Sequence, residues 1–115
     1  MTENLTLKEQ KIRQFRKGIL ELAVLKIISE QECYGYHIVD SLKKNSVMIS
    51  EGTIYPILSR LKEEQAISYR WEESTRGPPR KYYLLTEKGK ELLDLLIAEW
   101  RSINQGLDRI LGEKK

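Results

Sequence analysis

The sequence is poor in the residues that build disulfides, metal centres and membrane spans. Its 115 residues include one cysteine and one histidine. A single cysteine excludes an internal disulfide. One cysteine and one histidine are too few to bind a metal, which would need further ligands from carboxylates or a second subunit. Lys26 and Glu30 interrupt the most hydrophobic segment, so no apolar run is long enough to span a bilayer. The N-terminus also lacks the apolar stretch of a secretory signal, and we therefore expect a cytoplasmic protein without membrane contact.

Signatures of catalysis are equally scarce. The sequence has no glycine-rich loop of the kind that binds phosphate. Cys33 and His37 are four residues apart, as a thiol and its base can be, but no third group accompanies them. The favoured interpretation is a buried thiol and a surface or DNA-facing imidazole. We therefore expect a protein that is not an enzyme and that uses no cofactor and no metal.

The size and charge of the chain set broad limits. With 40% hydrophobic residues it has room for one domain with a modest core, and dimerisation would increase the marginal stability of so small a domain. Twenty Lys and Arg stand against 17 Asp and Glu, a net charge of +3. This balance is too weak to indicate nucleic acid by itself, so the position of the charges matters more than their sum.

Helical periodicity describes the first half of the chain. From Leu5 onward apolar residues cover so much of one helix that a second protomer is expected on the side that the core leaves free. Residues 31–35 are expected to end this helix, and residues 36–44 form a second, shorter one. A third helix begins with Ser50 or Thr53 as its N-cap.

The third helix has two contrasting faces. Its inward stripe has the i, i+3, i+4 and i+7 spacing of a buried helix face and consists of Ile54, Ile57, Leu58 and Leu61. The opposite side has small, hydroxylated and cationic groups that suit close approach to a DNA groove. An ordinary solvated face explains this side of the helix equally well. The residues on it are Gly52, Thr53, Tyr55, Pro56, Ser59 and Arg60.

A cationic hairpin follows. Residues 67–72 and 80–85 alternate as two antiparallel strands do, and the Gly-Pro-Pro turn must project beyond the paired region. Arg76, Arg80 and Lys81 at this tip suit sugar-phosphate or a minor groove, although a charged tip also serves solubility. For the aromatic residues of the strands, packing is favoured over base stacking. These aromatic residues are Trp71, Tyr82 and Tyr83.

The last helix is long and broadly apolar. Thr86 reads as its N-cap, and its apolar residues from Leu92 to Leu111 are more than a small domain can cover. We expect a homodimer built mainly from this helix and the first one. The predicted fold is thus mainly α with a small β-hairpin, a winged helix-turn-helix with N- and C-terminal dimerisation helices. It divides into a DNA-binding domain over residues 5–86 and a dimerisation helix over residues 87–112.

Short motifs run in order from the first helix to the start of the last. They are Tyr34-Gly-Tyr-His-Ile38, Gly52-Thr-Ile-Tyr-Pro56, Leu58-Ser-Arg-Leu61, Trp71-Glu-Glu-Ser74, Gly77-Pro-Pro-Arg-Lys-Tyr-Tyr83 and Leu85-Thr86 with Gly89. This series resembles the PadR family of transcriptional regulators, and the ordered set is far more specific than any one motif. The resemblance implies a winged helix-turn-helix repressor that dimerises through its C-terminal helix and is released from its operator by a small molecule.

The resemblance also assigns residues to sites. It implies that one of Tyr34 and Tyr36 meets the DNA backbone, and the sequence leaves open which. By the same likeness Trp100, with Phe15 or Ile103, lines a pocket for a flat aromatic effector, whereas the simpler interpretation makes Trp100 only an anchor of the dimer interface. The implied DNA contacts are Tyr36, Gly52, Thr53, Tyr55, Ser59, Arg60, Arg76, Gly77, Arg80 and Lys81.

The sequence thus predicts a regulator that binds double-stranded operator DNA as a homodimer. We expect a repressor of an adjacent operon that a small hydrophobic or aromatic effector relieves. The alternative is a winged domain of the same fold that binds other proteins and has no affinity for a duplex.

Overall fold

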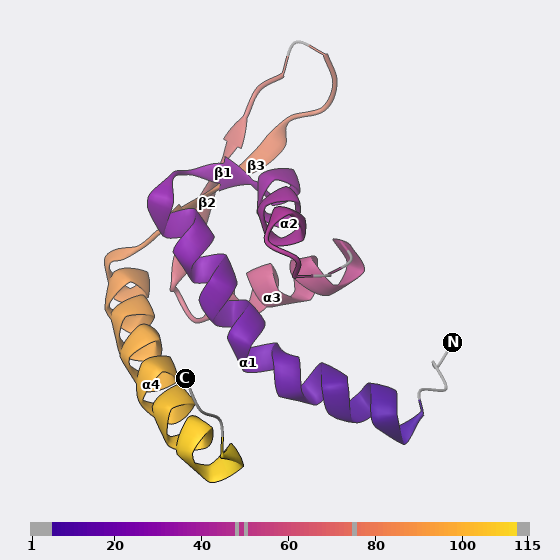
Figure 1. Ribbon diagram of the computed structural model, residues 1–115. Coiled ribbons are helices and arrows are strands. Elements are labelled where there is room, and N and C mark those ends of the chain that lie inside the picture. Colours follow the sequence, from indigo (N-terminus) through magenta and orange to yellow (C-terminus); the bar gives the residue numbers. More distant parts are fainter. Residues whose placement is uncertain (1–5, 48, 50, 75, 113–115) are drawn as a thin grey trace.

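Figure 1 shows a computed structural model of the chain, which describes residues 6–47, 49, 51–74 and 76–112. The elements follow in the order α1 (Leu7–Glu30), β1 (Cys33–Tyr34), α2 (Gly35–Lys44), α3 (Glu51–Glu63), β2 (Ile67–Glu72), β3 (Arg80–Leu85) and α4 (Glu87–Leu111). Helices α2 and α3 lie together beside α1, the loop between β2 and β3 extends away from the helices, and α4 runs along the other side of the molecule. None of the described helices combines the length and apolarity needed to cross a membrane.

The sheet has one more strand than the sequence predicts. Strand β3 pairs with β2 on one side and with β1 on the other, both antiparallel. The prediction that residues 31–35 end the first helix is confirmed, since α1 ends at Glu30 with Gln31 as its C-cap. The same segment also forms a strand that was not predicted, because Cys33 and Tyr34 pair with Tyr83 and Tyr82 of β3. A two-residue strand has no alternation of its own, so only pairing with a distant segment produces it.

The start of α3 excludes one of the two predicted caps. The helix begins at Glu51, so Thr53 lies within its first turn and is not the N-cap. Ser50, the other predicted cap, lies outside the described residues. Pro56 lies inside the helix, and because proline has no N–H, the carbonyl of Gly52 has no helical donor four residues on.

The ends of α2 and α3 share one geometry. At each end a residue other than glycine has a left-handed backbone, Ser46 with a φ of 64° and Gln65 with a φ of 66°. The next N–H donates to the carbonyl five residues back, Val47 to Leu42 at 2.8 Å and Ala66 to Leu61 at 2.9 Å. This is a Schellman closure, which turns the chain sharply out of each helix.

The core confirms the predicted inward faces of α2 and α3. Ile54, Leu58 and Leu61 are at most 2% exposed, and Ile38 and Leu42 of α2 are buried with them. Helix α1 contributes its second half to this core, through Leu20, Val24, Leu25 and Ile28. Its first half extends past the core, as Figure 1 shows at the N-terminal end.

Thr86 and Gly89 fix the start of α4. The Thr86 side chain caps the helix by accepting the Gly89 N–H at 2.9 Å, as the sequence predicts, and its hydroxyl is 2.7 Å from the carbonyl of Gln65. Gly89 is buried, and a Cβ placed on it would lie 2.0 Å from the carbonyl oxygen of Ala66. The absence of a side chain at Gly89 therefore allows α4 to touch the turn that follows α3.

Candidate nucleic-acid interface

The outer face of α3 is exposed along its length. Gly52, Pro56 and Ser59 form its outermost ridge, at helical spacing and opposite the buried stripe. Tyr55 lies on one flank of this ridge, whereas Thr53 and Arg60 lie seven residues apart on the other flank. All five predicted DNA contacts in this helix are exposed, as is Pro56 between them, so a partner can reach each of them.

A groove separates α3 from the hairpin. It encloses about 660 Å³ and receives side chains from the start of α2, from α3 and from β2 and β3. The groove brings together four residues that were predicted to bind DNA, since Tyr36, Tyr55, Arg80 and Lys81 all line it. The complete lining is Tyr34, Gly35, Tyr36, Tyr55, Trp71, Arg80, Lys81 and Tyr83.

Gly35 allows the Tyr55 ring to pack closely against the backbone at one side of this groove. A Cβ on Gly35 would lie 2.9 Å from the hydroxyl oxygen of Tyr55, so the bare backbone lets that ring lie against the start of α2. Tyr83 is almost fully buried here, and burial raises the pKa of its hydroxyl. At neutral pH the hydroxyl therefore stays protonated and can donate a hydrogen bond.

Cations of β3 rest on aromatic rings. The Lys81 ammonium lies 4.4 Å from the centre of the Tyr69 ring and 5.6 Å from that of Trp71, its cross-strand partner. The Arg80 guanidinium lies 5.5 Å from the centre of the Tyr34 ring. Such contacts hold a cation in place while leaving its charge unneutralised. Trp71 itself is 60% exposed, so it packs on its neighbours in the hairpin and not in the core.

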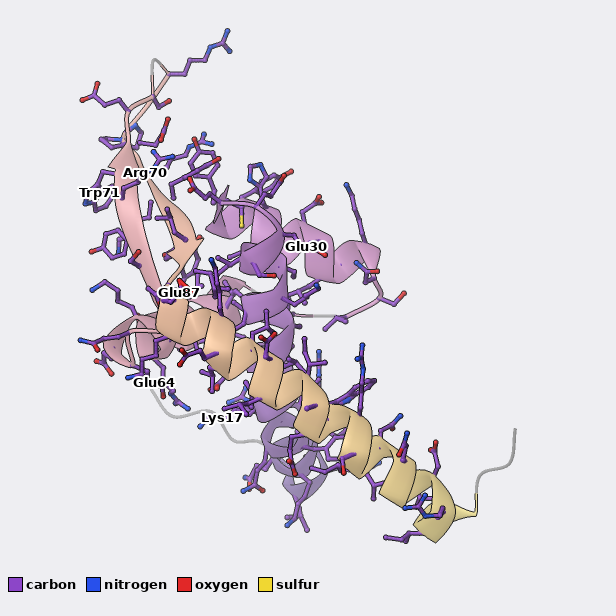
Figure 2. The ribbon with its side chains drawn as sticks, turned by 90° about the vertical axis from the view of Figure 1, so that its left-hand side faces the viewer. Lys17, Glu30, Glu64, Arg70, Trp71 and Glu87 are labelled. Atoms are coloured by element: carbon purple, nitrogen blue, oxygen red, sulfur yellow. The ribbon has the colours of Figure 1, made fainter. Side chains whose placement is uncertain are left out.

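Arg70 is a cation of a different kind. It ion-pairs with Glu32 at 3.1 Å and with Glu72 of its own strand, and it covers the Tyr82 ring at 4.5 Å. The hydrogen bonds to Glu32 and Glu72 raise the pKa of Arg70. Figure 2 shows Arg70 next to Trp71 on β2. Because two carboxylates already balance its charge, Arg70 adds less positive charge to this surface than Arg80 or Lys81 does.

Arg60 is tied to α1. Its guanidinium lies 3.5 Å from the Glu21 carboxylate, and the two side chains are 45% and 21% exposed. An ion pair this open to solvent contributes little to stability, so a phosphate can compete for Arg60. The pair shows which side of α1 faces α3.

The thiol of Cys33 and the imidazole of His37 lie in different environments. Cys33 is 1% exposed, and burial raises its pKa to about 11, so the thiol is protonated at neutral pH. His37 is exposed and stacks near Tyr34 and Tyr36. Among the described residues, no group of three metal-ligating side chains lies close enough to bind an ion.

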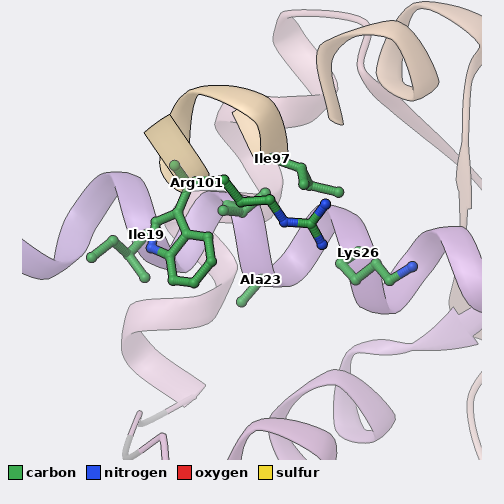
Figure 3. Close-up of a pocket in the computed structure, with 7 residues that line it drawn as sticks. Ile19, Ala23, Lys26, Ile97 and Arg101 are labelled. Carbon is green, nitrogen blue, oxygen red and sulfur yellow. The ribbon is translucent and has the colours of Figure 1, made fainter. Parts of the chain in front are cut away.

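A second cavity, of about 350 Å³, lies between α1 and α4. Figure 3 shows Ile19, Ala23 and Lys26 of α1 facing Ile97 and Arg101 of α4 across it. Trp100 lines this cavity together with Leu22. Phe15 and Ile103, the other predicted effector contacts, are 74% and 51% exposed and are not among its lining residues.

Sequence reasoning missed part of the groove. Tyr34 was left undecided, and Gly35, Trp71 and Tyr83 were not predicted to lie beside the candidate DNA contacts. The motif that contains Tyr34 and Gly35 was the available signal. Arg76 and Gly77 are exposed in the loop between β2 and β3, outside the groove lining.

Comparison with known proteins identifies the family. The chain matches the transcriptional regulator PadR-like family over residues 24–95. It is 34% identical over 85 residues to the transcriptional regulator YqjI of Escherichia coli strain K12. The aligned region covers 71% of this chain and 39% of that regulator. The solved structure of a PadR-like transcription factor from Bacteroides fragilis has 42% identity and a TM-score of 0.77, over 88% of this chain and 98% of that one.

A further similar structure contains nucleic acid. Bacillus subtilis PadR, solved in complex with operator DNA, has 28% identity and a TM-score of 0.64, over 69% of this chain and 47% of that chain. The match over residues 24–95 includes α2, α3 and the hairpin, the elements that build the candidate interface. The chain belongs to the PadR-like family of transcriptional regulators.

Proposed function

We propose that this chain regulates transcription by binding operator DNA, with α3 in the major groove and the β2–β3 hairpin on the neighbouring backbone. The observation that carries the proposal is the groove that gathers Tyr36, Tyr55, Arg80 and Lys81 beside the exposed ridge of α3. An exposed helix next to a cationic hairpin is the arrangement that reads a duplex in winged helix-turn-helix proteins. The similar structure of Bacillus subtilis PadR, solved in complex with operator DNA, supports operator DNA as the partner here.

The proposed roles follow from side-chain chemistry. Arg76, Arg80 and Lys81 contact phosphates, and the backbone at Gly77 lets the loop approach the DNA closely. The exposure of Tyr36 supports it as the ring that meets the DNA backbone, since its side chain is 63% exposed. The Tyr34 ring instead packs edge-on against the Tyr82 ring, with 4.9 Å between the ring centres.

In α3, base edges are read by short side chains. Thr53 and Ser59 offer hydroxyls to them, Tyr55 and Arg60 flank them, and Gly52 lets the helix enter deeply.

We further propose that two copies dimerise through α1 and α4. Both helices expose large apolar side chains, among them Phe15 at 74%, Leu95 at 69% and Ile110 at 79%, and exposure of this extent favours burial against a partner. Residues 5–86 then act as the DNA-binding unit and residues 87–112 as the dimerisation helix. Such a dimer addresses two half-sites about 34 Å apart, one turn of the duplex.

An effector site is proposed between α1 and α4. The cavity that Trp100 lines is nearly all apolar and large enough for a small aromatic molecule. Ile103 follows Trp100 by one turn and Phe15 precedes Ile19 by one turn, so both can extend this site in a dimer. A ligand held there would alter the packing of the helices that set the half-site spacing, and so relieve repression of an adjacent operon.

Fluorescence tests the effector site directly. In a Trp71→Phe variant, Trp100 is the one indole that remains, so titration with a panel of planar aromatic molecules reports on the cavity alone. Quenching or a spectral shift with at least one of them is expected. An emission spectrum that none of them alters would argue for Trp100 as an interface anchor only.

A mobility shift with the DNA upstream of the protein's own gene tests the main proposal. Arg80→Ala should weaken binding to every sequence, whereas changes at Thr53 or Ser59 should alter which sequence is preferred. Arg70→Ala is the matched control, because it removes a hairpin arginine that Glu32 and Glu72 already neutralise. If the wild-type protein shifts no duplex even at low salt, the winged domain serves contact with other proteins instead.

A further inference from the structure

Most of the excess positive charge of the chain lies on the first half of α1, to which the proposed function gives no role on DNA. Between Leu7 and Gly18 five cationic residues stand against the single acidic Glu9, a net charge of +4, while the whole chain carries +3. The remainder of the chain therefore sums to −1. The cations are Lys8, Lys11, Arg13, Arg16 and Lys17.

This half of the helix has two different sides. Ile12, Phe15 and Ile19 recur at helical spacing and are 53%, 74% and 46% exposed, so they form the apolar side that a second copy would cover. The other side continues the line of the buried Val24. Lys17 precedes Val24 by seven residues, and Arg13 precedes Lys17 by four. This side of α1 is therefore apolar at Val24, where the helix packs on the core, and cationic at Lys17 and Arg13, where the helix extends past the core.

The ion pair between Glu21 and Arg60 places the cationic side next to α3. Glu21 follows Lys17 by four residues, on the same side of α1, and its carboxylate lies 3.5 Å from the Arg60 guanidinium. Arg60 is on the flank of α3 opposite Tyr55, and Tyr55 lines the groove against the hairpin. The outer ridge of α3 is thus bordered by the hairpin cations on one flank and by α1 on the other.

We propose that Arg13 and Lys17 form a second surface that contacts the phosphates of double-stranded DNA, on the flank of α3 opposite the hairpin. The inference rests on the proposed function. A helix in the major groove, which is about 12 Å wide, has a sugar-phosphate backbone on both sides. The hairpin meets one of these backbones and the cationic side of α1 meets the other. Glu21 also lies on this flank, and Arg60 offsets its charge.

Two double variants with equal loss of charge test the proposal. Arg13→Gln with Lys17→Gln removes the proposed surface, whereas Lys8→Gln with Lys11→Gln removes two charges from the side that carries Ile12 and Phe15. The probe is a duplex of random sequence, because phosphate contacts carry no sequence information. Fluorescence anisotropy measures its affinity across a series of salt concentrations, and melting curves and light scattering confirm that each variant remains folded and in its original oligomeric state.

The expected result is a loss confined to the first variant. Each phosphate contact contributes about 0.9 to the slope of log K against log salt, so removing two per protomer lowers the slope by about 1.8 per protomer. At about 0.1 M salt the same relation gives roughly an eightfold loss of affinity for each contact. The control variant should keep a slope near that of the wild type.

Four outcomes would overturn the proposal. Equal losses in the two variants would show that general charge, and not this surface, attracts DNA. An unchanged slope of log K against log salt after Arg13→Gln with Lys17→Gln would remove these residues from the DNA interface. If that variant lost binding to anionic phospholipid vesicles but kept its binding to the duplex, the surface would be assigned to lipid. If the wild-type protein binds no duplex at any salt concentration, the proposed function fails as well, so the two failures are distinguishable.

Discussion

Gly89→Ala tests the contact by which α4 is fixed to the rest of the fold. Gly89 lies in the first turn of α4, where its N–H donates to the Thr86 side chain at 2.9 Å. A Cβ added there would lie 2.0 Å from the carbonyl oxygen of Ala66 and 2.8 Å from a methyl carbon of Leu85. The first of these atoms is backbone and cannot rotate away, so the whole helix must move.

The change that Gly89→Ala causes in the free energy of unfolding follows from two opposed effects. Replacing glycine by alanine in a helix normally stabilises it by up to about 1 kcal/mol. Relieving the contact with Ala66 requires the helix to shift by roughly 1 Å, and forcing an extra methyl group into a packed site costs about 3 kcal/mol. The net loss is about 2 kcal/mol, which lowers the Tm of a chain of this size by roughly 8 °C.

Thermal unfolding at fixed protein concentration measures this change. Gly18→Ala is the control, because a Cβ on Gly18 meets no atom within 4 Å and the position is within α1. This control should be neutral or slightly more stable than the wild type. If Gly89→Ala were as stable as Gly18→Ala, α4 would not sit against Ala66 as described. A shifted α4 should also weaken operator binding, since α4 would set the spacing of the two DNA-binding units.

Three further predictions concern stability. Gln65→Gly should raise the free energy of unfolding by about 1 kcal/mol, since glycine adopts the left-handed backbone of Gln65 without strain; a lower Tm would contradict this. Thr86→Ala should lower it by about 1–2 kcal/mol through loss of the cap, and Thr86→Ser should recover most of the loss in urea titrations. Burial raises the Cys33 pKa from 9.0 to about 11. The contribution of the buried thiol to the free energy of unfolding is therefore intact below pH 9 and is lost as the pH rises towards 11. Wild type should therefore lose stability, by about 3 kcal/mol at most, relative to Cys33→Ala over this range, and parallel pH curves would refute it.

Local patterns were sufficient for the parts of the fold that repeat with a fixed period. The stripe of Ile54, Leu58 and Leu61 predicted the buried face of α3, and its complement predicted the exposed ridge. The alternation over residues 67–72 and 80–85 predicted both hairpin strands with the bounds that the structure has. Each of these signals comes from residues adjacent along the chain, so no knowledge of the distant packing was needed.

Contacts between distant segments account for what was missed. Strand β1 exists because Cys33 and Tyr34 pair with β3 nearly fifty residues later, and two residues carry no period. The groove depends on the same pairing, which brings the start of α2 beside the hairpin. Gly35 illustrates the limit: in the sequence it predicts only a turn, and its role in admitting the Tyr55 ring emerges from the tertiary structure alone.

The distribution of charge shows why a net value is a weak guide to a nucleic-acid protein. A total of +3 conceals a helix segment of +4, because carboxylates elsewhere cancel it. Some of those carboxylates, such as Glu32 and Glu72, neutralise Arg70 on β2. The hairpin charges that face a partner are then mainly those of Arg80 and Lys81 on β3. Screening limits the reach of exposed charges to about 10 Å at 0.1 M salt, so a phosphate responds to the nearest side chains and not to the total. What matters is which cations border the ridge of α3, and the fold sets that by placing Glu21, and with it the cationic side of α1, against Arg60.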